Sequence, residues 1–468
     1  MTPVQAAPSD TDPVVRELSE AIGGPVGEHA IRPPRRRFWT VLRVVLFVAI
    51  IGFAFSFLQK SPCRDGGWAD NSQYKQFCYT DVVALYYAEN ISNGAVPYRD
   101  HPVEYPVLTG VFMGVLGLPV YWMGQGNPAL DQARTFFDIN AVVLSLLGIG
   151  AVAAIWALRR RRPWDAMMLA AAPAIIYTAT VNWDLLAVSL ATFFLLAFGR
   201  KYFVWAGILL GLAVAAKFYP LLFAGPMLLL AWRSRRYAET MLTLGTALLT
   251  WVMVNAPVAL LWPESWKRFF ELNSERGIDW GTLWYVLRFL TPSEGVHLLD
   301  GRSFLNSAYL LLFVVACVGI AVMVAFAPRK PRLAQLLFLV VAAFLLTGKV
   351  WSQQYVLWLL PLVILARPKW GAFLAWQCAE LFYFLAFYGE LINASGGFAF
   401  PEWVFIVASL GRITTVAVLC ALIIREMWRP ELDAVAGYAV DDDEDSVYKG
   451  DSLLSPTALG TAEKPATA

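Results

Sequence analysis

The sequence predicts an all-α polytopic membrane protein, a bundle of about twelve transmembrane helices with two larger external loops. Three observations predict this fold class. Hydrophobic residues make up 58% of the 468 residues, and the mean hydropathy is +0.55. Apolar runs of roughly the 20 residues that one crossing needs recur from Phe38 to Arg425. Lys and Arg gather in short segments between these runs, as they do in cytoplasmic loops.

The basic clusters orient the chain, because short cytoplasmic loops carry the excess of Lys and Arg. They are Arg35 to Arg37, Arg159 to Arg162, Arg200-Lys201, Arg233 to Arg236, Arg329 to Arg332, Arg367 to Lys369, and Arg425 with Arg429. With all of them inside, the predicted spans are 38–58, 135–158, 164–182, 184–199, 202–218, 219–232, 240–262, 304–327, 333–348, 353–366, 370–388 and 402–424. Both termini are then cytoplasmic, and the first span is predicted to be an uncleaved anchor.

One apolar run does not fit this alternation. If Pro106 to Gly124 crossed the membrane, Arg159 to Arg162 and every later basic loop would lie outside. Its internal glycines and Pro119 also weaken a straight transmembrane helix. We therefore predict a juxtamembrane or re-entrant helix that packs against the outer surface, where apolar non-spanning backbone is tolerated.

The domain organisation follows from these spans. Residues 1–37 are predicted to be a disordered cytoplasmic tail, and residues 38–424 form the transmembrane domain. Its large external loops are 59–134 and 263–303. Residues 425–468 are predicted to be an acidic, disordered cytoplasmic tail. The net charge of +2 gives no reason to expect nucleic acid as a partner.

The cysteines fall into two groups. Cys63 and Cys78 flank a polar stretch directly after the first span, in a loop that should face an oxidising space, so they are a candidate disulfide. The spacing leaves two free thiols as the alternative. Cys317, Cys378 and Cys420 lie within apolar runs and are expected to be small core residues.

Two carboxylates of the first external loop are candidate catalytic groups. Asp81 begins a short amphipathic segment, where an acceptor of orphan amides is equally expected from Asp81 or Thr80. As a functional group, an external Asp with an ordinary pKa near 3.9 is ionised and can take a proton from an attacking hydroxyl. Glu104, bracketed by two prolines, is either a second catalytic carboxylate or a helix-start charge. His101 has no second His or Cys at ligand spacing, so no metal is expected.

Cations and amides recur at the other external span ends. Lys217 is either a snorkelling lysine or a phosphate contact. Arg276, Lys349 and the amides near Gln353 add further donors, and a carrier would instead place such groups at mid-depth. Carboxylates and cations on one face suit transfer from an anionic lipid carrier. Deeper in the membrane, Glu380 and Arg412 lie halfway across two adjacent spans and should meet, as a structural ion pair or as a lipid-phosphate contact.

These residues resemble the GT-C superfamily of polyprenyl-phosphate-sugar-dependent glycosyltransferases, and most of all glycosyltransferase family 87, the actinobacterial mannosyltransferase-like membrane proteins. The resemblance rests on Asp81 with Tyr86, Gly94 with Pro97-Tyr98, Glu104-Tyr105-Pro106, Asn182-Trp183-Asp184, Lys217-Phe218-Tyr219-Pro220, Ser352 to Tyr355, and Trp358 to Pro361. The chain departs from the usual Tyr-Pro-Pro at Val107 and has no histidine near Gln353.

The resemblance implies that an acid of the first loop, here Asp81, is the base of an inverting, cofactor-free transfer. The donor would be a sugar, for which mannose is expected, on a polyprenyl phosphate, and the acceptor a cell-envelope glycolipid or glycan at the outer face of the plasma membrane. Glu104 joins Asp81 as a catalytic candidate. The expected donor phosphate and lipid contacts are Lys217, Tyr219, Arg276 and Lys349. The expected substrate contacts are Tyr86, Tyr98, His101, Tyr105, Asn182, Asp184, Gln353, Gln354 and Tyr355.

Two other classes stay open at this point. A lipid or sugar transporter or flippase predicts repeated halves and polar residues at mid-depth, and apart from Glu380 and Arg412 the sequence shows neither. A non-catalytic scaffold for envelope assembly predicts a degenerate first loop, whereas this loop carries Asp81 and Glu104. Membrane lipids are expected partners in all three cases.

Overall fold

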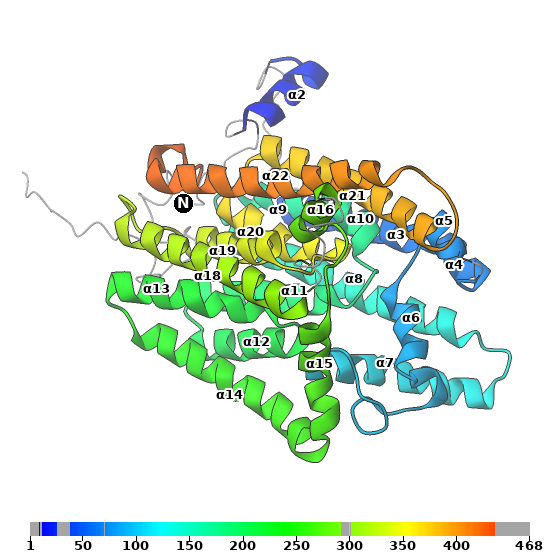
Figure 1. The fold of residues 1–468 in the computed structure, drawn as a ribbon. Coiled ribbons are helices and arrows are strands. Elements are labelled where there is room, and N and C mark those ends of the chain that lie inside the picture. The colour runs from blue at the N-terminus through cyan, green and yellow to red at the C-terminus, as the bar shows by residue number, and fades with distance from the viewer. Residues whose placement is uncertain are drawn as a thin grey trace, which may run out of the picture.

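The computed structural model describes residues 9, 12–25, 38–69, 71–291, 299 and 301–435, and over this part of the chain the secondary structure is helical. Long helices pack side by side into one bundle (Figure 1). The prediction of an all-α polytopic membrane protein is confirmed.

The first third of the chain supplies one long helix and then most of the short ones. In order, the elements are α2 (Pro13–Gly23), α3 (Val41–Gln59), α4 (Ser61–Gly66), α5 (Ser72–Lys75), α6 (Asp81–Ala88), η1 (Ile91–Asn93), α7 (Val107–Gly126), α8 (Gln132–Leu158), η2 (Pro163–Asp165), α9 (Ala166–Ala170) and α10 (Pro173–Thr178). The helices from α4 to α6 come from the predicted first external loop.

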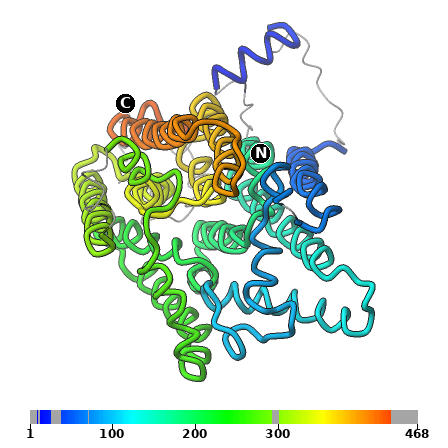
Figure 2. The backbone as a smooth tube through the Cα atoms, turned by 45° about the vertical axis from the view of Figure 1, so that its right-hand side comes forward, coloured from blue at the N-terminus to red at the C-terminus, as the bar shows by residue number. Residues whose placement is uncertain are grey.

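The rest of the chain completes the bundle. Its elements are α11 (Asp184–Gly199), α12 (Phe203–Ala216), η3 (Tyr219–Phe223), α13 (Ala224–Ser234), α14 (Ala238–Leu261), α15 (Pro263–Glu275), α16 (Leu283–Leu290), α18 (Arg302–Phe326), α19 (Leu333–Thr347), η4 (Gln353–Tyr355), α20 (Val356–Ala366), α21 (Trp370–Ala394), α22 (Glu402–Trp428) and η5 (Pro430–Leu432). The tube view shows α15 and the loop before α8 projecting from the bundle (Figure 2).

Burial within the protein separates the central helices from the peripheral ones. Every residue of α20 is buried, as are most residues of α11 and α19. In the most apolar 18-residue stretches of α14 and α18, by contrast, 17% and 11% of the residues are buried within the protein. A helix that is apolar all round needs an apolar surround. Protein supplies it for α20, and the membrane must supply it for α14 and α18.

Seven helices in the described residues are long and apolar enough to cross a membrane, judged by length and composition. Six of them, α3, α8, α14, α18, α21 and α22, match predicted spans. The predicted spans near α11, α12, α19 and α20 contain shorter apolar helices. The seventh long helix is α7, which the sequence analysis did not count as a span.

The direction of the helices around α7 can be followed through hydrogen bonds. Trp183 Nε1 donates to Asn140 Oδ1 at 2.7 Å, and Ser189 Oγ donates to the Leu147 carbonyl at 2.7 Å. The helix α11 therefore runs parallel to α8. The helix α12 returns antiparallel to α11, because Lys217 at its end forms an ion pair with Asp184 at 3.2 Å. The beginnings of α8 and α11 and the end of α12 thus share one end of the bundle.

Both ends of α7 lie at that same end. Near its start, Thr109 Oγ1 donates to the carbonyl of Ala216 at the end of α12, at 2.6 Å. Near its finish, Gly124 lies against Gln132 at the start of α8, so closely that a Cβ atom would not fit. The helix α7 is continuous, so it is not re-entrant, and both of its ends contact residues at the same end of the bundle, as expected for a juxtamembrane helix.

The predicted span 164–182 is wrong as a single helix. The chain passes from the end of α8 to the start of α11 through η2, α9 and α10, with a break before Pro173. Proline fits the first turn of α10 but interrupts a helix that would continue through it. Most of the side chains in this segment are buried, so the irregular backbone is shielded from lipid by protein.

Parts of both predicted disordered tails are ordered. The helix α2 begins after the cap residue Asp12, whose other carboxylate oxygen accepts the N–H of Trp370 at 2.7 Å. At the other end α22 continues to Trp428, and Asp433 receives two hydrogen bonds from Arg332 at 2.9 Å. These contacts are long-range, and tail composition does not reveal them. The remaining tail residues, 436–468 and most of 1–37, lie outside the described residues.

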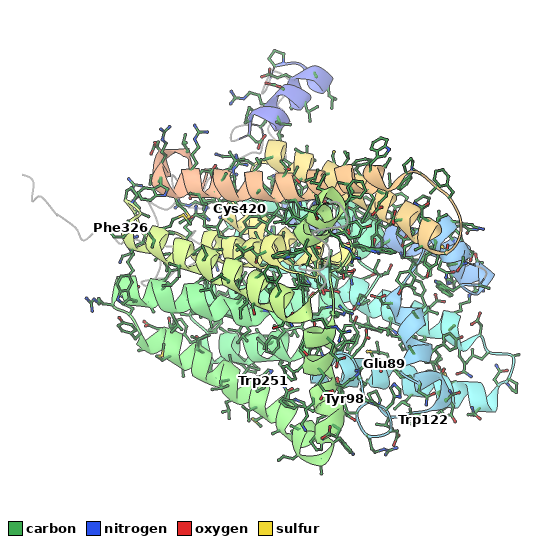
Figure 3. All side chains as sticks on the ribbon, viewed as in Figure 1. Glu89, Tyr98, Trp122, Trp251, Phe326 and Cys420 are labelled. Carbon is green, nitrogen blue, oxygen red and sulfur yellow. A yellow bond between two sulfur atoms is a disulfide. The ribbon has the colours of Figure 1, made fainter. Side chains whose placement is uncertain are left out.

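The basic clusters that oriented the chain lie where helices end. Arg332 donates to the carbonyls of Leu365 and Ala366 at 2.7 and 2.6 Å. Arg233 likewise donates to the carbonyls of Val324 and Ala327, beside Phe326, which Figure 3 labels at one extreme of the bundle. Cations at helix C-termini satisfy the last carbonyl groups and interact favourably with the helix dipole.

The deep pair predicted from the sequence meets. Arg412 Nε lies 3.1 Å from Glu380 Oε2, and both side chains are buried. Arg412 also donates to the backbone carbonyls of Trp351 and Ser352 at 2.9 and 3.0 Å. The pair is therefore structural, and it fixes the turn that precedes α20.

We predict that Arg412→Leu lowers the stability of the detergent-solubilised protein by about 3–5 kcal/mol, because it leaves the Glu380 carboxylate buried without its partner. Thermal unfolding followed by size-exclusion chromatography measures the effect. Arg425→Leu, at an exposed position of the same helix, is the control. Equal melting temperatures for the two variants would contradict this role of Arg412.

Candidate active site

Asp81 is free of the capping role that the sequence left open. Thr80 is the N-cap of α6, and its Oγ1 accepts the N–H of Val82 at 3.2 Å. The same hydroxyl donates to the Thr180 carbonyl at 2.7 Å, which ties α6 to the segment before α11. The carboxylate of Asp81 is therefore available for other contacts.

Two neutral donors hold the carboxylate of Asp81. Tyr79 Oη donates to Oδ1 at 2.7 Å, and Asn182 Nδ2 donates to Oδ2 at 2.6 Å. Burial raises the pKa of Asp81 above its ordinary value, while the two hydrogen bonds and the charge of Lys217 oppose this rise. The ordinary pKa expected from the sequence is thus wrong. Two carboxylate lone-pair sites are engaged, and the others are free to accept a proton.

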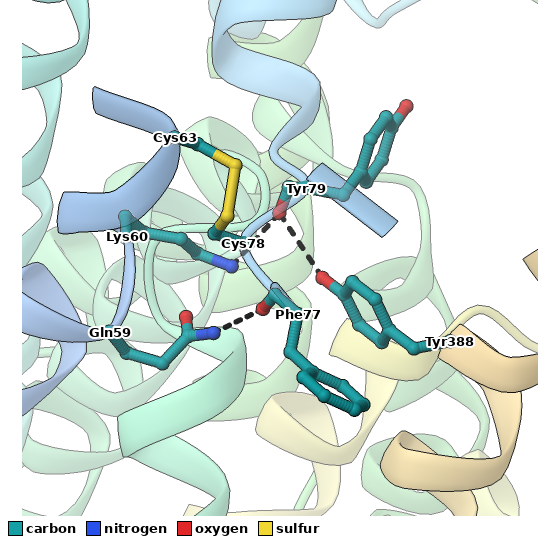
Figure 4. Close-up of a disulfide and its surroundings, with 7 residues drawn as sticks. All are labelled: Gln59, Lys60, Cys63, Phe77, Cys78, Tyr79 and Tyr388. Atoms are coloured by element: carbon teal, nitrogen blue, oxygen red, sulfur yellow. Dashed lines mark hydrogen bonds between the residues drawn. A yellow bond between two sulfur atoms is a disulfide. The ribbon is translucent and has the colours of Figure 1, made fainter. Parts of the chain in front are cut away.

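The backbone before Asp81 is held by a cluster of contacts around the disulfide (Figure 4). Cys63 and Cys78 are bonded, which joins α4 to the chain just before α6. The buried Lys60 Nζ donates to the Tyr79 carbonyl at 2.9 Å, and Tyr388 Oη donates to the same carbonyl at 3.4 Å. The position of the Tyr79 backbone, and hence of Asp81, is set by α3, α4 and α21 together.

A cavity of about 340 Å³ lies beside this carboxylate. Its polar wall consists of Glu104, Tyr105, Lys217, Asn273, Arg276, Tyr309 and Tyr355. Its apolar wall includes Phe218, Leu221, Leu222, Phe269, Leu272, Leu310, Phe313 and Phe344. The apolar wall is built from α15, α18, α19 and η3. A ligand with a charged head and a hydrocarbon tail suits this division.

Asn182 connects Asp81 to the cavity. Besides its bond to Asp81, its Nδ2 donates to Tyr105 Oη at 2.5 Å, and Tyr105 lines the cavity. Asp81 does not line the cavity itself, because Asn182 lies between it and Tyr105. Glu104, by contrast, forms part of the cavity wall. The two candidate carboxylates therefore lie on the two sides of Tyr105.

Lys217 is partly neutralised and is surrounded by aromatic rings. Its ammonium lies 3.2 Å from the fully buried Asp184, whose Oδ1 also accepts Trp358 Nε1 at 2.6 Å. The ammonium lies 5.1 and 5.5 Å from the ring centroids of Tyr105 and Tyr355. Such contacts hold a cation at an apolar boundary and contradict a freely snorkelling lysine.

The rings behind Lys217 form one stack. Tyr355 lies 3.8 Å from Trp358 between centroids, and Tyr219 lies 4.4 Å from it, both nearly parallel to the indole. Tyr219, Tyr355 and Trp358 all line the cavity. The predicted ligand-contact residues Tyr219 and Tyr355 are thus brought to the cavity, and Trp358, which was noted for the resemblance alone, joins them.

Glu104 and Arg276 face the cavity from two different loops. Burial raises the pKa of Glu104, and the positive charge of Arg276 counteracts this. The backbone N–H of Glu104 donates to Glu89 Oε1 at 3.1 Å, and burial raises the pKa of Glu89 to about 7. Sequence reasoning missed Glu89, because no motif marks a carboxylate that acts through a backbone contact fifteen residues away.

Lys349 has a structural position. Its ammonium donates to the carbonyls of Ser274 and Arg276 at 3.2 and 2.6 Å and to Asn306 Oδ1 at 2.6 Å. All three of its N–H donors are therefore used within the protein. We withdraw the expected phosphate contact and assign Lys349 to holding the end of α15, which presents Arg276.

The remaining predicted contact residues lie around the site rather than in this cavity. Tyr86 Oη donates to Gln132 at 3.0 Å, and Tyr98 Oη donates to the Tyr105 carbonyl at 2.9 Å. His101 lies 3.5 Å from Glu89, on the same loop as the labelled Tyr98 in Figure 3. Gln353 and Gln354 are buried in the turn that Arg412 holds.

Metal ligation is not apparent in the described part of the chain. Among its residues, no group of three or more His, Cys, Asp or Glu side chains has the geometry to hold an ion. The cations of the cavity wall are Lys217 and Arg276.

The sequence was compared with those of known protein families. The sequence model of glycosyltransferase family 87 matches residues 105–352, more than half of the chain. The chain belongs to glycosyltransferase family 87. The match includes Lys217, Arg276 and the apolar cavity wall, and it begins one residue after Glu104. No curated protein matches the sequence. With the helical bundle described above, family membership makes the protein a membrane glycosyltransferase.

We predict that Tyr79→Phe lowers kcat roughly tenfold, about 1.4 kcal/mol in the barrier, because it removes a donor that orients Asp81. The lost hydrogen bond favoured the ionised form, so the pKa of Asp81 should rise and the acidic limb of the pH–rate profile should move to higher pH.

Tyr74→Phe is the matched control, since the Tyr74 ring packs at 6.0 Å from that of Tyr79. Its pH profile should equal that of the unmodified protein. An acidic limb that stays in place in Tyr79→Phe would contradict the assignment of that limb to Asp81.

Proposed function

We propose that this protein transfers a sugar, in our hypothesis mannose, from a polyprenyl-phosphate donor to a cell-envelope glycolipid or glycan at the outer face of the plasma membrane. The observation that carries the proposal is the cavity itself. One wall holds Lys217 and Arg276 beside Glu104 and Tyr105, and the other consists of hydrocarbon side chains from helices of the bundle. A polyprenyl-phosphate sugar has the same division into a charged head and an apolar tail.

The charge of the wall favours a phosphodiester over a pyrophosphate donor. Lys217 is paired with Asp184, and Glu104 adds a negative charge beside Arg276. The wall therefore offers a modest positive field, which suits the single charge of a lipid phosphodiester. A nucleotide sugar carries two phosphates and no tail, so it would leave the apolar wall unused.

In the proposed reaction Asp81 is the general base. The acceptor hydroxyl loses its proton to Asp81 as its oxygen attacks the anomeric carbon, and the bond from that carbon to the phosphate oxygen breaks. Attack from the side opposite the phosphate inverts the configuration, through a transition state with oxocarbenium character. The electron pair stays on the phosphate oxygen, where Lys217 and Arg276 stabilise the added charge.

The protein's own hydrogen bonds prepare Asp81 for this step. Tyr79 and Asn182 fix both carboxylate oxygens, so the base is oriented before the acceptor arrives. Burial makes Asp81 a stronger base than an exposed aspartate. Asn182 also ties it to Tyr105, which keeps the base at a fixed place relative to the donor cavity.

A transport function finds less support. A carrier would use polar groups at mid-depth. In the described residues, the deep charged pair is Glu380 with Arg412. The guanidinium of Arg412 donates to Glu380 and to two backbone carbonyl groups, so the pair is engaged within the protein. The outer location of the site and the plasma membrane remain part of the proposal, supported by the distribution of Lys and Arg.

We predict that Asp81→Asn lowers transfer by at least about 100-fold, because the amide cannot accept the hydroxyl proton. The variant should be expressed and folded as the unmodified protein, since an amide keeps the shape and an acceptor oxygen. The assay incubates purified protein with radiolabelled polyprenyl-phosphate mannose and membrane lipids and detects labelled product.

Glu104→Gln separates the two carboxylates. We expect it to retain much more activity than Asp81→Asn. Full transfer by Asp81→Asn, together with loss in Glu104→Gln, would move the base to Glu104.

We predict that Arg276→Gln raises the KM for the donor by roughly 10- to 100-fold, since a hydrogen bond to a charged group contributes about 1.5–3 kcal/mol. Arg268→Gln, on the same helix but not part of the cavity wall, is the control. An unchanged donor KM in Arg276→Gln would exclude a phosphate contact there.

A further inference from the structure

A second hollow lies beyond the cavity described above. It has a volume of about 400 Å³ and is lined by Ile278, Trp280, Tyr285, Arg288, Phe289 and Glu402. These residues come from the segment after α15, from α16 and from the first turn of α22. The residues of this hollow have no role in the proposed reaction described above.

The aromatic residues of the second hollow are fixed in place. The Trp280 ring packs edge to face on Phe387 at 5.8 Å, and its backbone N–H donates to Asp279 Oδ1 at 3.0 Å. Tyr285 packs against Phe405 at 5.6 Å between ring centroids. Both rings are therefore positioned before any ligand binds.

The hollow also offers a carboxylate acceptor. Tyr285 Oη donates to Glu402 Oε1 at 2.7 Å, which orients the carboxylate. The second carboxylate oxygen of Glu402 can accept a hydrogen bond from a hydroxyl group of a ligand. Fixed aromatic rings beside an oriented carboxylate suit a sugar, whose C–H faces are apolar and whose edges carry hydroxyl groups.

The segment that follows α15 contributes residues to both cavities. Arg276 lines the first cavity, while Ile278 and Trp280 line the second. Between them, the backbone N–H of Asp279 donates to the Lys349 carbonyl at 2.9 Å, which holds this segment against the turn before α20. A ligand in the second hollow would thus lie a few residues of backbone away from the donor phosphate site.

We propose that the second hollow binds the sugar chain of the acceptor, a neutral hexopyranose oligosaccharide. This inference rests on the proposed function for its place in the reaction. The donor is a poor candidate for the hollow, because its lipid tail requires the long apolar wall of the first cavity. A neutral glycan needs neither that wall nor a cluster of cations.

Binding of soluble oligosaccharides tests the proposal without requiring transfer. Protein in lipid nanodiscs is titrated with α-1,6-mannotriose and with maltotriose, and saturation-transfer NMR reports binding. We expect one of them to bind. Trp280→Ala should weaken that binding at least tenfold, and Glu402→Gln should also weaken it. Trp403→Ala, which changes a 58% exposed tryptophan outside the hollow, should have no effect.

The outcomes separate this inference from the proposed function. Binding lost in Trp280→Ala and kept in Trp403→Ala supports the glycan site, whether or not mannose is transferred. Failure of both sugars to bind, or equal binding by Trp280→Ala and the unmodified protein, overturns it, even where Asp81→Asn abolishes transfer. Glu402→Gln gives the same decision if Trp280→Ala does not fold.

Discussion

The buried ion pair between Arg412 and Glu380 is the contact on which the wall with Lys217 and Arg276 depends. A guanidinium deep in an apolar bundle must be fully partnered. Arg412 meets this requirement by binding Glu380 and by donating to the carbonyls of Trp351 and Ser352. Arg412 therefore fixes the non-helical turn that contains Trp351 and Ser352, shortly before α20.

That turn also affects the cavity that contains Lys217 and Arg276. On one side it precedes Tyr355 and Trp358, the rings behind Lys217. On the other side it follows Lys349, whose ammonium holds the last turn of α15 and so the backbone of Arg276. The two cations of the wall, Lys217 and Arg276, come from different helix ends, α12 and α15. Aromatic rings and Asp184 hold Lys217, whereas Lys349 holds the backbone of Arg276.

Sequence reasoning was strongest where one rule fixes one local feature. Basic clusters predicted that α7 is not a span, and the contacts of Thr109 and Gly124 bring both of its ends to one end of the bundle. The Cys63–Cys78 bond could be predicted as a candidate because both cysteines lie in one external loop. The contact of Glu380 with Arg412 could be predicted because a buried charge needs a partner.

Long-range contacts explain what the sequence did not reveal. The break before Pro173 depends on burial among α3, α20 and α21, which shields its irregular backbone. The shifted pKa of Asp81 depends on the bundle closing around it, and the role of Lys349 depends on where α15 ends. None of these can be deduced from residue type and spacing alone.

The arginine caps at helix ends have a consequence for how the protein meets its lipids. Arg332 and Arg233 are predicted to face the cytoplasm, yet their guanidinium groups donate to carbonyl oxygens. Arg332 is further neutralised by Asp433. A charge already engaged inside the fold attracts anionic headgroups less than a free one. The surface that is predicted to face the cytoplasm should therefore bind anionic lipids more weakly than its number of basic residues suggests.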